Sequence, residues 1–177
     1  MILEKKNIIL VGMTGVGKTT IGRSLSKILR KNFIDIDLEI EKESGLKVSD
    51  IFENYGEEKF RNIEKKILFE TLEIKENAVI STGAGILSND EVIQTIKKKS
   101  LSIFLEIKTS NLIYRLKNNL KNRPMLRKGD LETNLQIMHE KRIKGYEKAD
   151  IKISVDGLAL TDIVKRIIHK LKYYEKH

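Results

Sequence analysis

Residues 12–20 have the residue types and the spacing that bind phosphate groups. They read Gly-Met-Thr-Gly-Val-Gly-Lys-Thr-Thr, in which a glycine and four further residues are followed by Gly-Lys-Thr. Glycines let successive backbone N–H groups point at phosphate oxygens, and a helix beginning there adds the positive end of its dipole. We expect Lys18 to reach the β- and γ-phosphates of a nucleoside triphosphate and the Thr19 hydroxyl to bind Mg²⁺.

Two aspartates end the next apolar stretch. Residues 33–37 read Phe-Ile-Asp-Ile-Asp, which predicts a strand with Asp35 and Asp37 on one face. In an open α/β sheet the carboxyl ends of the strands form the ligand-binding edge. There we expect the two carboxylates to supply a ligand for a metal-bound water and a base. The alternative is that Asp37 only caps a helix that begins near Leu38.

Two arginines lie on or beside apolar helical stripes. Arg142, in a predicted helix at residues 131–148, shares one face with Leu131, Leu135, Met138 and Tyr146. An inward cation must pair with a carboxylate or line a wet cleft, and arginine suits a two-point grip on a carboxylate or phosphate. An internal ion pair is the alternative. Arg61 lies in a predicted helix at residues 57–72, where Glu64 offers it an ordinary ion pair.

Two further segments have polar or small residues where a phosphate-binding protein needs them. The predicted strand at residues 78–81 runs into Thr82-Gly83-Ala84-Gly85, whereas ATPases and GTPases of the switch type place a Mg²⁺-binding aspartate there. Such a turn exposes backbone N–H groups, although it is also an ordinary route from strand to helix. Residues 118–130 are polar and basic, which predicts either a lid over the triphosphate or a disordered connector.

Short apolar strands alternate with helical stretches along the chain. Strands are predicted at residues 7–11, 33–37, 78–81, 101–107 and 150–155, with helices between them. This alternation predicts an α/β fold of three layers, in which a parallel sheet is covered by helices on both faces. At 177 residues we expect one domain that spans residues 1–177, with a substrate-binding segment at about 33–62 and a lid at about 118–130.

Composition narrows the function classes. The chain has no cysteine and three histidines, so disulfides, thiolate chemistry and cysteine metal sites are excluded. Its net charge of +9 comes from scattered lysines and arginines, so we expect no nucleic-acid partner. No apolar run is long enough to cross a membrane, and the N-terminus lacks the layout of a signal peptide. We therefore expect a cytoplasmic protein that acts as a monomer without a membrane partner.

Over nearly its whole length the sequence resembles the shikimate kinases. The resemblance rests on residues 12–20, 33–37, 51–52 with 56–57, 60–64, 81–85, 123–126 and 141–142 with 146. It implies a P-loop kinase fold with five parallel strands in the order 2-3-1-4-5. It also implies transfer of the γ-phosphoryl group of ATP to the 3-hydroxyl of shikimate, with Mg²⁺, in aromatic amino-acid biosynthesis.

The resemblance also implies roles for individual residues. Shikimate would be held by Asp37, Arg61, Arg142 and the backbone of Gly83, Ala84 and Gly85, with Asp37 acting at the reacting hydroxyl. ATP and its metal would be held by Gly12, Gly15, Val16, Gly17, Lys18, Thr19, Thr20, Arg115 and Arg123, with Asp35 ordering a water on Mg²⁺. Lys18 and Arg123 would join Asp37 in catalysis.

Two positions depart from the family pattern. Ala84 replaces the middle glycine of a family triplet, and it preserves backbone donation only with a negative φ. Residues 154–157, Ser-Val-Asp-Gly, lack the polar pair that many members place near adenine.

The competing interpretations are a kinase of gluconate or of a nucleoside monophosphate, and a GTP-binding switch protein. The switch protein needs an Asn-Lys-x-Asp motif, and the nearest string, residues 147–150, reads Glu-Lys-Ala-Asp.

Overall fold

A five-stranded parallel sheet forms the centre of the computed structural model, which describes residues 7–117 and 129–176. Its order is β2-β3-β1-β4-β5, which confirms the implied topology. The strands are β1 (Asn7–Val11), β2 (Asn32–Asp35), β3 (Ala78–Ser81), β4 (Ser100–Glu106) and β5 (Ile151–Ser154). Every residue of β1 and β3 is buried, as expected for parallel strands covered on both faces.

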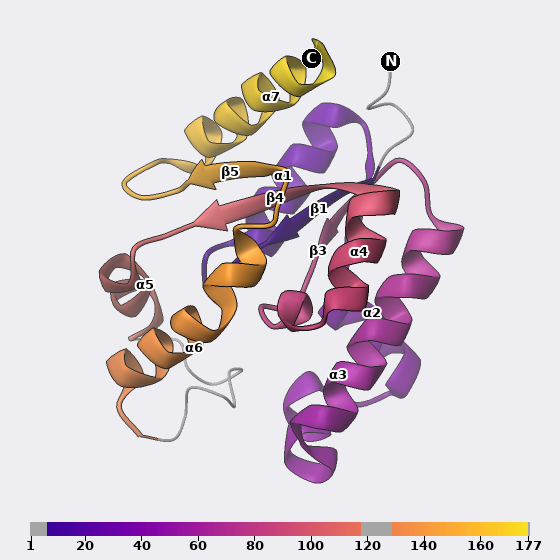
Figure 1. The fold of residues 1–177 in the computed structure, drawn as a ribbon, viewed down its shortest axis with the longest axis vertical. Helices are drawn as coiled ribbons and strands as arrows, with labels where there is room; N and C mark the ends of the chain where they lie inside the picture. Colours follow the sequence, from indigo (N-terminus) through magenta and orange to yellow (C-terminus); the bar gives the residue numbers. More distant parts are fainter. Residues whose placement is uncertain (1–6, 118–128, 177) are drawn as a thin grey trace.

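Helices cover both faces of this sheet (Figure 1). They are α1 (Lys18–Leu29), α2 (Ile36–Ser44), α3 (Val48–Ile74), α4 (Asp90–Lys99), α5 (Thr109–Leu116), α6 (Leu131–Tyr146) and α7 (Leu160–Lys176), with a short 3₁₀ turn, η2 (Ile86–Ser88). Helix α1 packs against α7, whereas α4 packs against α3 and β4. No helix in the described parts of the chain is long and apolar enough to span a bilayer.

The predicted ends of the strand at residues 33–37 and of the helix at residues 57–72 differ from the structure, and local hydrogen bonds decide where β2 ends and where α4 begins. Strand β2 ends at Asp35, whose Oδ1 accepts the Asp37 N–H at 3.1 Å, so Asp37 lies in the first turn of α2. Helix α4 is capped by Asn89, because the Ser88 hydroxyl donates to Gly85 O at 2.7 Å. Helix α3 begins before Gly56, where the backbone departs from helical geometry with a φ of 78°.

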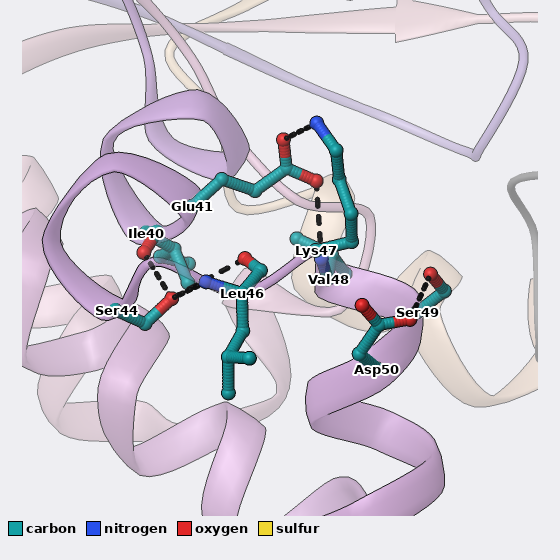
Figure 2. Close-up of polar contacts among 8 residues, drawn as sticks. All are labelled: Ile40, Glu41, Ser44, Leu46, Lys47, Val48, Ser49 and Asp50. Carbon is teal, nitrogen blue, oxygen red and sulfur yellow. Dashed lines mark hydrogen bonds and ion pairs between the residues drawn. The ribbon is translucent and has the colours of Figure 1, made fainter.

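A polar network joins α2 to α3 (Figure 2). The Glu41 carboxylate accepts the Val48 N–H at 3.1 Å, and its other oxygen accepts Lys47 Nζ at 2.9 Å. The Ser44 hydroxyl donates to Ile40 O at 2.7 Å and so closes the end of α2. These contacts hold the end of α2 against the start of α3. Helix α2 carries Asp37, and α3 carries Arg61.

Candidate active site

The phosphate-binding loop lies between β1 and α1, in the strand–loop–helix arrangement that the sequence predicted. Gly12, Gly15 and Gly17 have φ values of 143°, 80° and 105°, which L-residues rarely adopt. At Gly12 a Cβ would also lie 2.6 Å from Leu105 O, so the loop packs directly on β4. This backbone shape allows the N–H groups of the loop and of the start of α1 to point at one bound phosphate.

Lys18 lies across this loop. Its side chain is buried, and Nζ donates to Gly12 O at 2.7 Å and to Met13 O at 3.0 Å. The ammonium group is therefore held beside the N–H groups that would surround a phosphate.

Three side-chain oxygens meet at the carboxyl ends of β2 and β3. The Thr19 hydroxyl donates to Asp35 Oδ2 at 2.7 Å and lies 3.5 Å from Ser81 Oγ. Mg²⁺ prefers such hard oxygen donors and takes few protein ligands, because it keeps several waters. Thr19 and Asp35 therefore fit the predicted magnesium site. Ser81, which sequence reasoning did not single out, occupies the place of the aspartate found in switch-type proteins.

A cavity of about 520 Å³ opens beside the loop. Its lining comes from the phosphate-binding loop, α2, the turn after β3 and α5, namely Thr14, Gly15, Gly17, Lys18, Thr19, Thr20, Asp37, Ser81, Thr82, Gly83, Ala84, Arg115 and Leu116. Arg115 Nη1 donates to Val16 O at 3.2 Å, whereas the Val16 side chain is buried and Gly12 does not line the cavity. A second cavity of about 310 Å³ is lined by Arg61, Gly85 and Arg142, among others.

The Asp37 carboxyl lines the first cavity. Its Oδ1 is buried without a partner among the described residues. Burial, together with the negative charges of Glu64 and Asp35, raises the pKa of Asp37 to about 7, although Lys18 and Arg61 oppose the rise. A carboxyl with this pKa is suited to accept a proton near neutral pH.

Arg61 forms ion pairs with two carboxylates of its own helix. Nη1 donates to Glu64 Oε2 at 2.6 Å, and Nη2 lies 3.2 Å from Glu57 Oε1. The predicted pair with Glu64 therefore exists, but Glu64 is fully buried and the pair is not a surface one. Burial raises the Glu64 pKa, Arg61 opposes it, and Glu64 Oε1 has no hydrogen-bond partner in the described structure.

The two glycines of the turn after β3 are needed for space and not for φ. A Cβ on Gly83 would lie 1.9 Å from Glu64 Oε1, and one on Gly85 would lie 2.4 Å from the Arg61 guanidinium. Ala84 between them is not among the residues with positive φ, which meets the condition for backbone donation. The turn therefore keeps its N–H groups and brings Glu64 and Arg61 against its backbone.

Arg142 projects from α6 toward the same place. Leu135 and Tyr146 of its stripe are buried, which confirms the predicted inward face. Burial lowers the pKa of Arg142, and the Tyr146 hydroxyl opposes this. Within residues 7–117 and 129–176, Arg142 forms no ion pair, and its Nη1 is buried without a hydrogen-bond partner. The internal ion pair that was the alternative interpretation of Arg142 is absent from this part of the chain.

The phosphate-binding cavity is lined by the Asp37 carboxyl and by Gly83 and Ala84 of the turn, and the second cavity is lined by Gly85 of the same turn and by two arginines. Such a site suits an anionic small molecule with a hydroxyl that reacts beside the phosphate. Sequence reasoning did not foresee Glu57 or the burial of Glu64, because the spacing of charges within a helix does not report what packs against them. Arg123 and nearly all of the predicted lid lie outside the described residues.

Comparisons with known proteins show which family the chain is similar to. The family model described as shikimate kinase matches residues 14–172. The shikimate kinase of Pelotomaculum thermopropionicum is 41% identical over 94% of this chain and 96% of its own length. The solved shikimate kinase of Acinetobacter baumannii in complex with shikimate has a TM-score of 0.91 at 31% identity, over 96% of this chain and 94% of that one. A gluconokinase from Sinorhizobium meliloti, at 19% identity and a TM-score of 0.58 over 97% and 98%, shares the fold alone.

Proposed function

The chain belongs to the shikimate kinase family, and we propose that the cavity beside the phosphate-binding loop and the residues around Arg61 and Arg142 hold ATP and shikimate during transfer of the γ-phosphoryl group. Members of this family use ATP to phosphorylate a hydroxyl group of shikimate, and this chain is such a kinase. The observation that carries our assignment of the site is a set of buried atoms that have no hydrogen-bond partner among the described residues, Asp37 Oδ1, Glu64 Oε1 and Arg142 Nη1. Unpaired buried polar atoms are costly, so they mark a place where a polar ligand completes the hydrogen bonds.

On the acceptor side, Arg142 and Arg61 would hold the shikimate carboxylate. Arg142 has an unpaired guanidinium nitrogen, and Arg61 is oriented by Glu64 and lies against Gly85. The N–H groups of Gly83, Ala84 and Gly85 would hold the substrate from the opposite side. Asp37 would then accept the proton of the 3-hydroxyl as that oxygen attacks phosphorus, for which its pKa of about 7 is suited.

On the donor side, backbone N–H groups of the loop and Lys18 would surround the phosphates, and Arg115 would contact adenine. The binding residues proposed from the sequence are Gly12, Gly15, Val16, Gly17, Lys18, Thr19, Thr20 and Arg115, together with Arg123. Thr19 would bind Mg²⁺ directly and Asp35 through a water, as their oxygen cluster allows. Bound Mg²⁺ neutralises charge on the β- and γ-phosphates.

Catalysis in this site would depend on position and charge more than on covalent chemistry. Lys18 lies at the junction of the loop and the acceptor pocket, and its charge lowers the pKa of both Asp37 and Glu64. The cation that stabilises the transferring phosphoryl group thus also affects the base. We propose that the enzyme acts as a cytoplasmic monomer on these two small molecules, without nucleic acid or membrane.

A coupled ADP-release assay tests the substrate assignment. The purified chain is supplied with MgATP and, in separate reactions, with shikimate, gluconate or each of the four common nucleoside monophosphates. We expect shikimate-dependent ADP release at least about 100-fold above the others, because shikimate holds its carboxylate and hydroxyls on a rigid ring, whereas gluconate is an open chain and the nucleoside monophosphates have no carboxylate. Equal or faster turnover of gluconate or of a nucleotide would contradict the proposal.

A further inference from the structure

The hydroxyl of Tyr146 lies where three parts of the site meet. Tyr146 comes from α6, is 1% exposed, and its ring stacks on Phe104 of β4 with centroids 5.0 Å apart. The hydroxyl donates to Ala84 O in the turn after β3. It also lies 3.9 Å from Met13 Sδ in the phosphate-binding loop.

The hydroxyl also faces Arg142, which precedes it by one helical turn. Because its proton is donated to Ala84 O, its oxygen can only accept from a cation nearby. Burial raises the pKa of Tyr146 to about 12, and the positive charge of Arg142 opposes that rise. The phenol therefore stays protonated at neutral pH and keeps its donor role.

Helix α6 also approaches the turn through a glycine. A Cβ on Gly145 would lie 2.6 Å from Leu87 O and 3.1 Å from Leu87 Cβ, so the helix and the η2 backbone are in direct contact. Neighbouring residues of α6 thus hold this junction in two ways, by close approach at Gly145 and by a hydrogen bond at Tyr146. The junction therefore connects the helix that carries Arg142 to the turn at residues 83–85.

We propose that Tyr146 is a positioning residue that sets the distance between the Arg142 guanidinium and the turn at residues 83–85. The inference rests on the proposed function, in which both groups hold one shikimate molecule. A rigid substrate is bound well only when its two anchors are correctly spaced, and a small displacement weakens both contacts. The phosphate-binding loop depends little on this hydroxyl, because a hydroxyl–thioether contact is weak.

The test is Tyr146→Phe, which removes the hydroxyl and keeps the ring that stacks on Phe104. We expect the shikimate KM to rise by about 5- to 30-fold, while the ATP KM stays within about twofold. Gly145→Ala, which keeps the hydroxyl but pushes α6 away from Leu87, should raise the shikimate KM in the same selective way. Tyr114→Phe is the matched control, because Tyr114 is 82% exposed and should leave both KM values unchanged.

A shikimate KM within twofold of wild type in Tyr146→Phe overturns the proposal, as does an equal rise of both KM values, which a purely structural role would produce. Thermal melts of each variant show whether a rise in KM comes from a less stable fold or from a changed distance between Arg142 and the turn. Failure of the proposed function itself is distinguishable, since the wild-type chain would then not turn over shikimate. If wild type is active on shikimate and Arg142→Ala raises the shikimate KM but Tyr146→Phe does not, only the proposed role of Tyr146 has failed.

Discussion

The donor and acceptor halves of the site satisfy their polar groups in opposite ways. In the phosphate-binding loop, Lys18 donates to two carbonyls of its own loop and Thr19 donates to Asp35. In the acceptor pocket, Asp37, Glu64 and Arg142 each keep a buried atom without a partner in the described structure. Each such atom costs on the order of 1–3 kcal/mol. The side chains of the donor half thus have hydrogen-bond partners within the chain. The acceptor half holds destabilising groups whose hydrogen bonds a substrate would complete.

This contrast predicts which substitutions affect activity alone and which also change stability. Groups already bonded within the chain should lower stability when removed. Groups without partners should leave stability unchanged or raise it, since natural binding sites trade stability for function. The following substitutions test the two halves in order of expected effect.

Lys18→Ala should have the largest effect on turnover. Removing the cation from the phosphates should lower kcat by about 10³-fold, because charge on the transferring group is then no longer neutralised. Since Lys18 is buried and bonded to the loop, a fall in Tm of a few degrees should accompany this loss. Steady-state kinetics and melts would be compared with Lys27→Ala on the exposed side of α1. Retention of a tenth of wild-type kcat would contradict the loop assignment.

Asp37→Asn should lower kcat by roughly 10²- to 10³-fold while making the apo protein more stable at pH 8. The pKa of Asp37 is raised from 3.8 to about 7, so the folded state binds the proton more tightly than the unfolded state does. The carboxyl therefore contributes stability at pH values below 3.8, and this contribution is lost as the pH rises through about 7.

Urea unfolding of wild type and Asp37→Asn at pH 8 and at pH 4 checks this sign. We expect a gain of about 1–3 kcal/mol for the variant at pH 8 and little difference at pH 4. In wild type, kcat/KM for shikimate should fall as the pH drops below about 7, because the base becomes protonated. A variant that is less stable than wild type at pH 8 would show that the Asp37 carboxylate is satisfied in the folded chain.

Arg142→Ala and Arg61→Ala should both raise the shikimate KM, because each loses roughly 2–3 kcal/mol of binding free energy. The two variants should nevertheless differ in stability. Arg61→Ala leaves Glu64 buried without its cation, which costs about 3–5 kcal/mol. Arg142→Ala removes a cation without an ion pair in the described structure and should leave Tm near that of wild type. Arg142→Lys should not restore the KM, because an ammonium cannot make a planar two-point contact. A large fall in Tm for Arg142→Ala with an unchanged KM would make Arg142 a structural residue.

The donor half was predictable from the sequence because its residues are contiguous. The loop and the start of α1 follow from nine residues whose glycines admit only a few backbone shapes, and the strand follows from the apolar run just before them. The alternation of strands and helices likewise predicted a parallel sheet with helices on both faces. The strand order itself came from the resemblance to shikimate kinases, since hydrophobic periodicity does not say which strands are neighbours.

The acceptor half could be predicted only in part, because four separate segments build it. The stripe on α6 correctly placed Arg142 inward, but spacing within one helix could not show that it lacks an ion pair. The position of Asp37 in α2 depends on a single capping hydrogen bond from its own N–H to Asp35, and the strand pattern hid it. The burial of Glu64 depends on Gly83, which is distant in sequence.

The smallest effect is expected for Ala84→Gly, which restores the glycine triplet of the family. Gly83 and Gly85 are required because Glu64 and Arg61 occupy the space of their missing side chains, whereas Ala84 has no positive φ. A glycine at position 84 should therefore leave the shikimate KM within about twofold and lower stability by about 0.5–1 kcal/mol, because it adds freedom to the unfolded chain. Gly83→Ala is the opposing variant, and it should raise the KM strongly by displacing Glu64. Urea unfolding and shikimate titrations of both variants test this. If Ala84→Gly lowered the shikimate KM fivefold or more, the alanine would be restricting the turn. The acceptor half would then not be fully formed before the substrate binds.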